Sequence, residues 1–116
     1  MSRRDAERLG DIENAIEAIR SHTSRGDLTD ALVFDAVRAR LIEIGEAVKA
    51  LSVDLTEAEP EIPWSQIAGM RDRLAHHYFA ASSSIIEATV TRDLPELEAA
   101  VTRMKSVVGD PDSGLG

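Results

Sequence analysis

Apolar residues recur every three or four positions along most of this chain, which is the spacing of one face of an α-helix. The first stretch runs from about residue 5 to 22 and carries the apolar stripe Leu9, Ile12, Ile16 and Ile19. The second runs from about residue 30 to 51, with the stripe Phe34, Val37, Leu41, Ile44, Val48 and Leu51. Each pattern predicts an amphipathic helix, and Thr29 or Asp30 can cap the second one.

The second stretch is apolar around most of its circumference. Small or apolar residues also lie off its main stripe, at Ala31, Ala36, Ala39, Ile42, Gly45 and Ala47. A helix of this kind is buried on more than one side, so we expect it at the centre of a bundle or at a subunit interface. A glycine such as Gly45 in a helix interior costs roughly 1 kcal/mol of stability against alanine. Close approach of another helix at this position is a physical reason for accepting that cost.

The second half of the chain carries shorter stripes. Residues 52–62 form an acidic connection, and Pro63 suits the first turn of a third helix over about 63–78. The serines at 82–84 predict the cap of a short helix over about 85–91. Asp93 and Glu96 resemble a capping box, which predicts the start of a last helix.

No segment alternates apolar and polar residues as a half-buried strand would. We therefore predict an all-α antiparallel bundle of four main helices with one short extra helix, in a single domain over residues 1–108. Residues 109–116, rich in Gly, Asp and Pro, are expected to form a flexible tail.

Composition narrows this picture. The chain has no cysteine, which excludes disulfides, thiolate metal sites and a cysteine nucleophile. Its charged start lacks a signal-peptide pattern, and no run approaches the ~18 apolar residues of a membrane span, so we expect a cytoplasmic protein without a membrane partner. The net charge of −8 argues against a broad electrostatic surface for nucleic acid. Any contact with RNA is therefore expected to be local.

Candidate chemistry is concentrated in residues 69–79, Gly-Met-Arg-Asp-Arg-Leu-Ala-His-His-Tyr-Phe. This segment holds two of the three histidines of the chain, together with its only tyrosine. The guanidinium group of an arginine offers a fixed fork of donors that suits a phosphate, and histidine exchanges protons near neutral pH. The combination indicates phosphodiester chemistry.

On an ideal helix this segment has two interpretations. Asp72 and His76 are four residues apart and lie on one face, away from the apolar stripe Ile67, Met70, Leu74 and Tyr78. In the simpler interpretation that face is solvated, and Asp72 and His76 form a pair worth ~0.3 to 0.5 kcal/mol. In the other, a second copy of the chain turns the face into a cleft that receives Arg71 and His76 from each protomer.

Other kinds of site fit less well. His76 and His77 are neighbours that point ~100° apart, so they do not chelate one metal ion, and we expect no metal or other cofactor. No Gly-x-Ser-x-Gly elbow or Gly-rich phosphate loop occurs. His22 falls at the predicted end of the first helix, where a cation complements the carbonyl dipole, which favours a structural role.

Arg71, four intervening residues, His76, one further residue and Tyr78 match the R-x4-H-x-Y motif of HEPN-family ribonuclease toxins, specifically the HepT branch. The flanking sequences resemble that branch as well. They are Ile-Gly-Glu-Ala at 44–47, Ile-Pro-Trp at 62–64, Gly-Met-Arg at 69–71 and His-His-Tyr-Phe at 76–79. The resemblance covers most of the chain.

The resemblance implies a homodimeric helical bundle that acts as a metal-independent endoribonuclease with a composite site at the dimer interface. His76 would move protons, and Arg71 would stabilise charge on the phosphoryl oxygens. Asp72 and Arg73 would support them. Asp72 stands where many relatives carry asparagine; it could orient the imidazole, although its carboxylate also repels phosphate.

The resemblance further implies a partner, a minimal nucleotidyltransferase antitoxin that transfers AMP to Tyr78 and so neutralises the toxin. The stripe also allows Tyr78 to be a core aromatic residue with its hydroxyl at the rim. Two other functions stay open on the sequence. One is a non-catalytic helical partner that presents nucleotide or RNA to the transferase, and the other is an acidic dimerisation bundle whose charged cluster is only surface.

Overall fold

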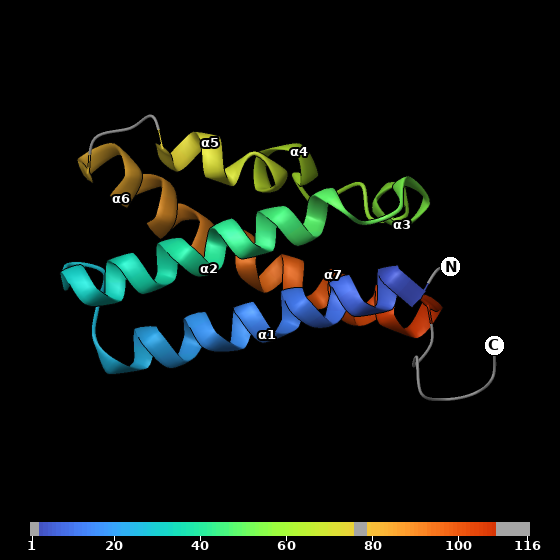
Figure 1. The fold of residues 1–116 in the computed structure, drawn as a ribbon, viewed down its shortest axis with the longest axis horizontal. Coiled ribbons are helices and arrows are strands. Elements are labelled where there is room, and N and C mark those ends of the chain that lie inside the picture. Colours follow the sequence, from blue (N-terminus) through green and yellow to red (C-terminus); the bar gives the residue numbers. More distant parts are fainter. Residues whose placement is uncertain (1–2, 76–78, 109–116) are drawn as a thin grey trace.

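The computed structural model describes residues 3–75 and 79–108, and the predicted tail at 109–116 lies outside them (Figure 1). The described residues form helices and connections without a strand, which confirms the all-α prediction. The elements in chain order are α1 (Arg3–Arg25), α2 (Ala31–Lys49), α3 (Val53–Glu57), α4 (Trp64–Ala68), α5 (Met70–Ala75), α6 (Phe79–Ala88), the π-helical turn η1 (Thr89–Asp93) and α7 (Leu94–Val108). No helix among them is long and apolar enough to cross a membrane.

Helices α1 and α2 form an antiparallel hairpin, and α7 packs along α1 (Figure 1). Both predicted stripes are buried, from Leu9 at 0% exposed to Leu51 at 7%. Asp30 caps α2, because its carboxylate accepts hydrogen bonds from the backbone N–H groups of Leu32 and Val33. Helix α1 continues three residues beyond the predicted end, so His22 lies in its last turn.

Helix α2 is central, as its all-round apolar character predicted. It contacts α1 on one side and α4, α5 and α6 on the other. The crossing with α4 occurs at Gly45, where an added Cβ would lie 2.6 Å from the carbonyl oxygen of Ile67. The prediction that Gly45 allows another helix to approach closely is therefore confirmed.

The segment before the candidate site departs from the predictions in two places. Residues 53–57 form the short helix α3, whereas the acidic composition predicted a connection without a helix there. Leu55 of α3 is buried at 1% exposure. The predicted helix over 63–78 is interrupted at Gly69, where ψ is 11° instead of about −42°. Its first and second parts are α4 and α5, and residues 76–78 lie outside the described residues.

The predicted caps in the C-terminal half are wrong, because α6, η1 and α7 form one continuous helical run. Ser82 lies inside α6, is 4% exposed, and its hydroxyl donates to the carbonyl oxygen of Leu74 at 3.5 Å. Asp93 belongs to η1, which leaves no free helix start to cap. Pro95 follows within α7 and has no N–H for a helical bond, and the adjacent Leu94 N–H reaches back five residues to Thr89.

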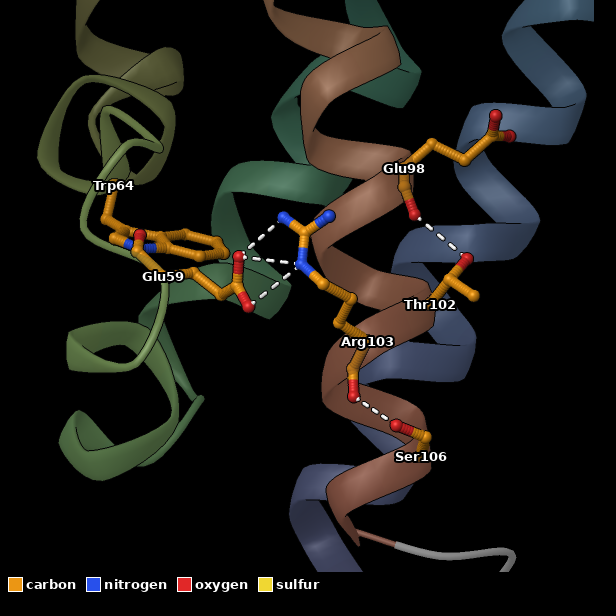
Figure 2. A network of polar contacts seen from close by, with 6 residues as sticks. All are labelled: Glu59, Trp64, Glu98, Thr102, Arg103 and Ser106. Carbon is orange, nitrogen blue, oxygen red and sulfur yellow. Dashed lines mark hydrogen bonds and ion pairs between the residues drawn. The ribbon is translucent and has the colours of Figure 1, made fainter.

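Polar contacts tie α7 to the rest of the bundle. The guanidinium group of Arg103 holds the carboxylate of Glu59 with contacts of 2.6 and 3.1 Å, and the indole N–H of Trp64 donates to the Glu59 carbonyl at 2.9 Å (Figure 2). Arg20 pairs with Glu98 at 2.5 Å, and Lys105 with Glu13 at 2.7 Å, so α7 is also joined to α1. These ties fix the frame on which α2 and α5 present the candidate site.

Candidate functional site

Arg71 lies in the first turn of α5, beside the central helix α2. Its side chain is 63% exposed, and its Nε donates a hydrogen bond to Glu46 Oε1 at 3.3 Å. Lys49 Nζ lies 3.8 Å from the same carboxylate oxygen. Because Glu46 directly follows Gly45, this contact forms next to the place where α2 and α4 approach most closely. The arginine of the predicted motif is thus joined to α2 through a carboxylate.

A groove of about 710 Å³ is lined by residues of α1 and α2 and by Arg71 of α5. Small side chains contribute to its lining, namely Ala15, Ala18, Ala47 and Ala50. The charged lining residues are three arginines and three carboxylates, and each arginine pairs with one of the carboxylates. They are Arg8 with Asp11, Arg40 with Glu43, and Arg71 with Glu46. We call this surface the Arg71 groove; it is balanced in charge rather than basic.

Asp72 and Arg73 follow Arg71 in α5 but are placed differently. Asp72 is exposed. Arg73 donates from Nη1 to the carbonyl oxygen of Gln66 at 3.3 Å and lines a second groove of about 450 Å³, which it shares with Arg92 of η1. Arg71 and Arg73 therefore line two different grooves. The supporting roles of Asp72 and Arg73 stay predictions.

The remaining members of the predicted site, His76 and Tyr78, lie outside the described residues, together with His77. Helix α5 ends at Ala75, one residue before His76, and α6 begins at Phe79, one residue after Tyr78. The backbone on either side of these residues thus belongs to α5, which carries Arg71, and to α6, and both helices pack on α2.

Comparison with known proteins shows which family this chain belongs to. A family model described as ribonuclease HepT-like matches residues 12–104, which is most of the chain. The chain belongs to the ribonuclease HepT-like family. The match extends from α1 into α7, so it includes Glu46, Arg71, His76 and Tyr78. This membership confirms the HepT resemblance and the prediction of a ribonuclease.

Individual HepT-like relatives agree with the family match. The chain is 38% identical over 93 residues to “Putative RNase TTE0752” of Caldanaerobacter subterraneus subsp. tengcongensis, covering 80% of this chain and 83% of that protein. It is 36% identical over 110 residues to a probable ribonuclease HepT of Thermococcus cleftensis, covering 90% of this chain and 99% of that protein. No solved structure matches the chain significantly.

Sequence reasoning did not assign a role to Glu46 in this HepT-like protein. The residue entered only as part of the Ile-Gly-Glu-Ala signature at 44–47, and its contact with Arg71 spans 25 residues of sequence. A usable signal was nevertheless present. Gly45 predicted a close helix approach, and the polar residue next to such a glycine lies near the approaching element.

Proposed function

We propose that this HepT-like ribonuclease is the toxin of a toxin–antitoxin pair and that it cleaves RNA internally, without a metal ion, at a site formed by two copies of the chain. Each copy would supply Arg71 and His76. The observation that carries this proposal is the position of Arg71, which is exposed and lines the Arg71 groove with its guanidinium Nε already held. A second copy that covers the groove would convert an open rim into a cleft.

The groove has features suited to a two-fold contact. A surface that packs on its own copy must be complementary to itself. The pairs Arg8–Asp11 and Arg40–Glu43 allow charges to meet opposite charges from the partner without using Arg71, and the alanine side chains allow helices to approach closely. In such a dimer the two Arg71 side chains would enter a shared, partly dehydrated space, where their attraction for phosphate is stronger than at an open surface.

The proposed chemistry requires only side chains of this chain. His76 removes the proton of an RNA 2′-hydroxyl as its oxygen attacks the adjacent phosphorus. The bond from phosphorus to the 5′-oxygen breaks, and that oxygen takes up a proton from the protonated His76 of one of the two copies, so the proton removed from the 2′-hydroxyl is replaced. Arg71 stabilises the charge that develops on the phosphoryl oxygens. The products are a 2′,3′-cyclic phosphate and a 5′-hydroxyl, so neither water nor a metal ion takes part in the cleavage step.

Neutralisation would occur by AMP transfer from ATP to Tyr78, catalysed by a minimal nucleotidyltransferase antitoxin. The tyrosine hydroxyl attacks the α-phosphorus of ATP, and pyrophosphate leaves. The proposal rests on the motif, in which Tyr78 stands two residues after His76. A nucleotide attached there places bulk and negative charge beside the site, which repels an RNA phosphate.

The decisive experiment uses protein expressed without any transferase, whose intact mass shows that Tyr78 is unmodified. RNA is incubated with excess EDTA, and the wild type is compared with the Arg71→Ala and His76→Ala variants. Arg92→Ala is the matched control, because it removes an exposed arginine from the other groove. We expect cleavage with 2′,3′-cyclic phosphate ends from the wild type and Arg92→Ala only. Equal cleavage by His76→Ala would overturn the proposed mechanism.

A second candidate function is a non-catalytic partner that presents nucleotide or RNA to the transferase. It is favoured by the net charge of −8 and by the pairing of Arg71 with Glu46 in place of a free cationic patch. Tight binding of the transferase by unmodified, dimeric wild-type protein that cleaves no RNA of several classes would support this function over the first.

A further inference from the structure

The pairing between Glu46 and Arg71 has a defined geometry. The carboxylate approaches the guanidinium through Nε, on the edge nearest the side-chain stem. Among residues 3–75 and 79–108, no hydrogen bond is found for the outer edge, which carries the two Nη atoms. That edge has the parallel donors that bind phosphate in a bidentate manner. The contact with Glu46 therefore orients the group without occupying its phosphate-binding edge.

The backbone beneath both side chains is fixed at close range. Gly45 brings α2 so near to α4 that a Cβ added at this glycine would lie only 2.6 Å from the carbonyl oxygen of Ile67 and 3.4 Å from the Cβ of Met70 in α5. Met70 is 1% exposed and directly precedes Arg71. The two residues flanking the pair on the chain, Gly45 and Met70, are thus packed against each other, so the distance between Glu46 and Arg71 is set by the core.

We propose that Glu46 is a positioning residue for Arg71, holding its guanidinium at Nε so that the Nη edge faces the scissile phosphate. This inference rests on the proposed function. Stability alone does not explain the pair. The side chains of Arg71 and Glu46 are 63% and 47% exposed, and an open ion pair of this kind adds little to folding. Holding a long side chain in one orientation instead contributes to the rate of the chemical step.

The carboxylate has two opposing effects on the reaction. It orients Arg71, which raises kcat, and it places a negative charge near the phosphate, which weakens RNA binding. Lys49, 3.8 Å from the same oxygen, offsets part of that charge. Removing the carboxylate should therefore separate the two kinetic constants, lowering kcat without raising KM. A residue with a merely structural role would lower activity through loss of folded protein and would not produce this separation.

The test compares the Glu46→Ala and Glu46→Gln variants with the wild type, measuring kcat and KM for one RNA substrate and the dimer content of each protein. Glutamine keeps an oxygen that accepts from Arg71 Nε but removes the charge. We expect kcat to fall about tenfold in Glu46→Ala and less than threefold in Glu46→Gln. We also expect a KM for Glu46→Gln at or below the wild-type value.

The matched control is Asp35→Asn. Asp35 is exposed on the same helix, eleven residues earlier, which places it roughly 20° from Glu46 around the axis but outside the Arg71 groove. This control removes the same charge from the same face and should leave kcat unchanged. A second readout does not depend on activity. The NMR signal of the Arg71 Nε–H, assigned by its loss in Arg71→Lys, should keep its position in Glu46→Gln and move toward that of a free arginine in Glu46→Ala.

The outcomes separate this inference from the function on which it rests. If the wild type cleaves RNA and Glu46→Ala matches its kcat, the positioning role is wrong while the ribonuclease site stands. If Glu46→Gln loses as much kcat as Glu46→Ala, orientation through Nε is also wrong. If the unmodified, dimeric wild type cleaves no RNA, the proposed function fails, and the positioning role fails with it.

Discussion

Two arginine–carboxylate pairs in this protein have the same chemistry but differ in geometry and in the exposure of the carboxylate. Arg103 donates hydrogen bonds from both Nε and Nη2 to the Glu59 carboxylate at 2.6 to 3.1 Å (Figure 2). The Glu59 side chain is only 16% exposed. Arg71 touches Glu46 through Nε alone at 3.3 Å, and both side chains remain open. The first pair engages Nε and Nη2 of the donor fork to join α7 to the connection before α4. The second leaves most of the fork available for a ligand.

With Arg71 in its proposed role, one residue type serves structure and function within a small bundle. A bidentate pair with a shielded carboxylate fixes the orientation of the guanidinium, and its Nε and Nη2 donors are engaged. A pair formed through Nε alone leaves the Nη groups of the arginine able to donate to a ligand. Geometry, rather than the presence of an ion pair, therefore separates the two roles.

The largest expected effect comes from removing Arg71, the arginine of the pair with a proposed functional role. Arg71→Ala should lower RNA cleavage by about 100-fold or more, because it removes donors that stabilise charge in the transition state, while the thermal midpoint stays near that of the wild type. Arg103→Ala should do the reverse, retaining kcat and lowering the midpoint. The two variants are compared by cleavage assay and thermal unfolding. A loss of kcat in Arg103→Ala without loss of folded protein would contradict the division of roles.

The next effect concerns the backbone beneath Arg71. Gly45→Ala should destabilise the fold by about 1–3 kcal/mol, because its Cβ meets a backbone oxygen that cannot move without shifting α4. Gly10→Ala is the control, since a Cβ there has nothing within 4 Å, and alanine should stabilise α1 by about 0.5–1 kcal/mol. Urea unfolding measures both. Equal stability of the two variants would show that the α2–α4 crossing is looser than described.

A smaller effect tests the structural pair through pH. Hydrogen bonding from Arg103 lowers the pKa of Glu59 below its ordinary value of 4.5. A lowered folded-state pKa adds stability that is complete above the ordinary value and is lost as pH falls through the folded-state value. Glu59→Gln should thus be less stable than the wild type at pH 7, by less than Gly45→Ala, and the difference should shrink in acid.

The matched control for that experiment is Glu57→Gln, two residues earlier and exposed on α3. It should follow the wild-type stability at every pH. A stability difference between Glu59→Gln and the wild type that stays constant from pH 7 down to about pH 3 would contradict the assignment to the Arg103 pair, since ionisation of the carboxylate would then play no part.

The smallest expected effect is that of Glu46→Ala on stability. Glu46→Ala should change the free energy of unfolding by no more than about 0.5 kcal/mol, because its partners are exposed and no packing is lost. Urea unfolding beside Glu59→Gln gives the direct contrast. A destabilisation by Glu46→Ala as large as that by Glu59→Gln would mean that both pairs are structural.

Much of the fold was predictable because its main helices are long and regular. The stripes of α1 and α2, the cap at Asp30 and the close approach at Gly45 all follow from local pattern, and the structure confirms them. The errors lie where one residue type serves two purposes. Serine and aspartate favour helix caps, yet Ser82 and Asp93 lie within a continuous helical run, because a buried hydroxyl bond and a widened turn accommodate them there.

The residues of the candidate site stay predictions, and only part of their arrangement follows from the sequence. The motif predicts a role for Arg71, and the family match shows a ribonuclease without testing that role. The separation of Arg71 from Arg73 follows from helix geometry, since residues two apart point roughly 200° away from each other. The role of Glu46 could not be predicted from pattern, because a contact across 25 residues depends on how α2 and α5 pack.

The turn η1 also sets the phase between two hydrophobic stripes. Ile86 and Leu94 are both buried, at 0% and 3% exposure, yet they are eight residues apart, which on an α-helix would rotate them roughly 80° out of line. The wider turn at Thr89–Asp93 uses fewer degrees per residue and absorbs the mismatch. A chain shorter by one residue here would align the same side chains as an ordinary α-helix, since seven residues turn roughly 700°. We therefore expect deletion of one residue from this turn to keep Ile86 and Leu94 on the buried face.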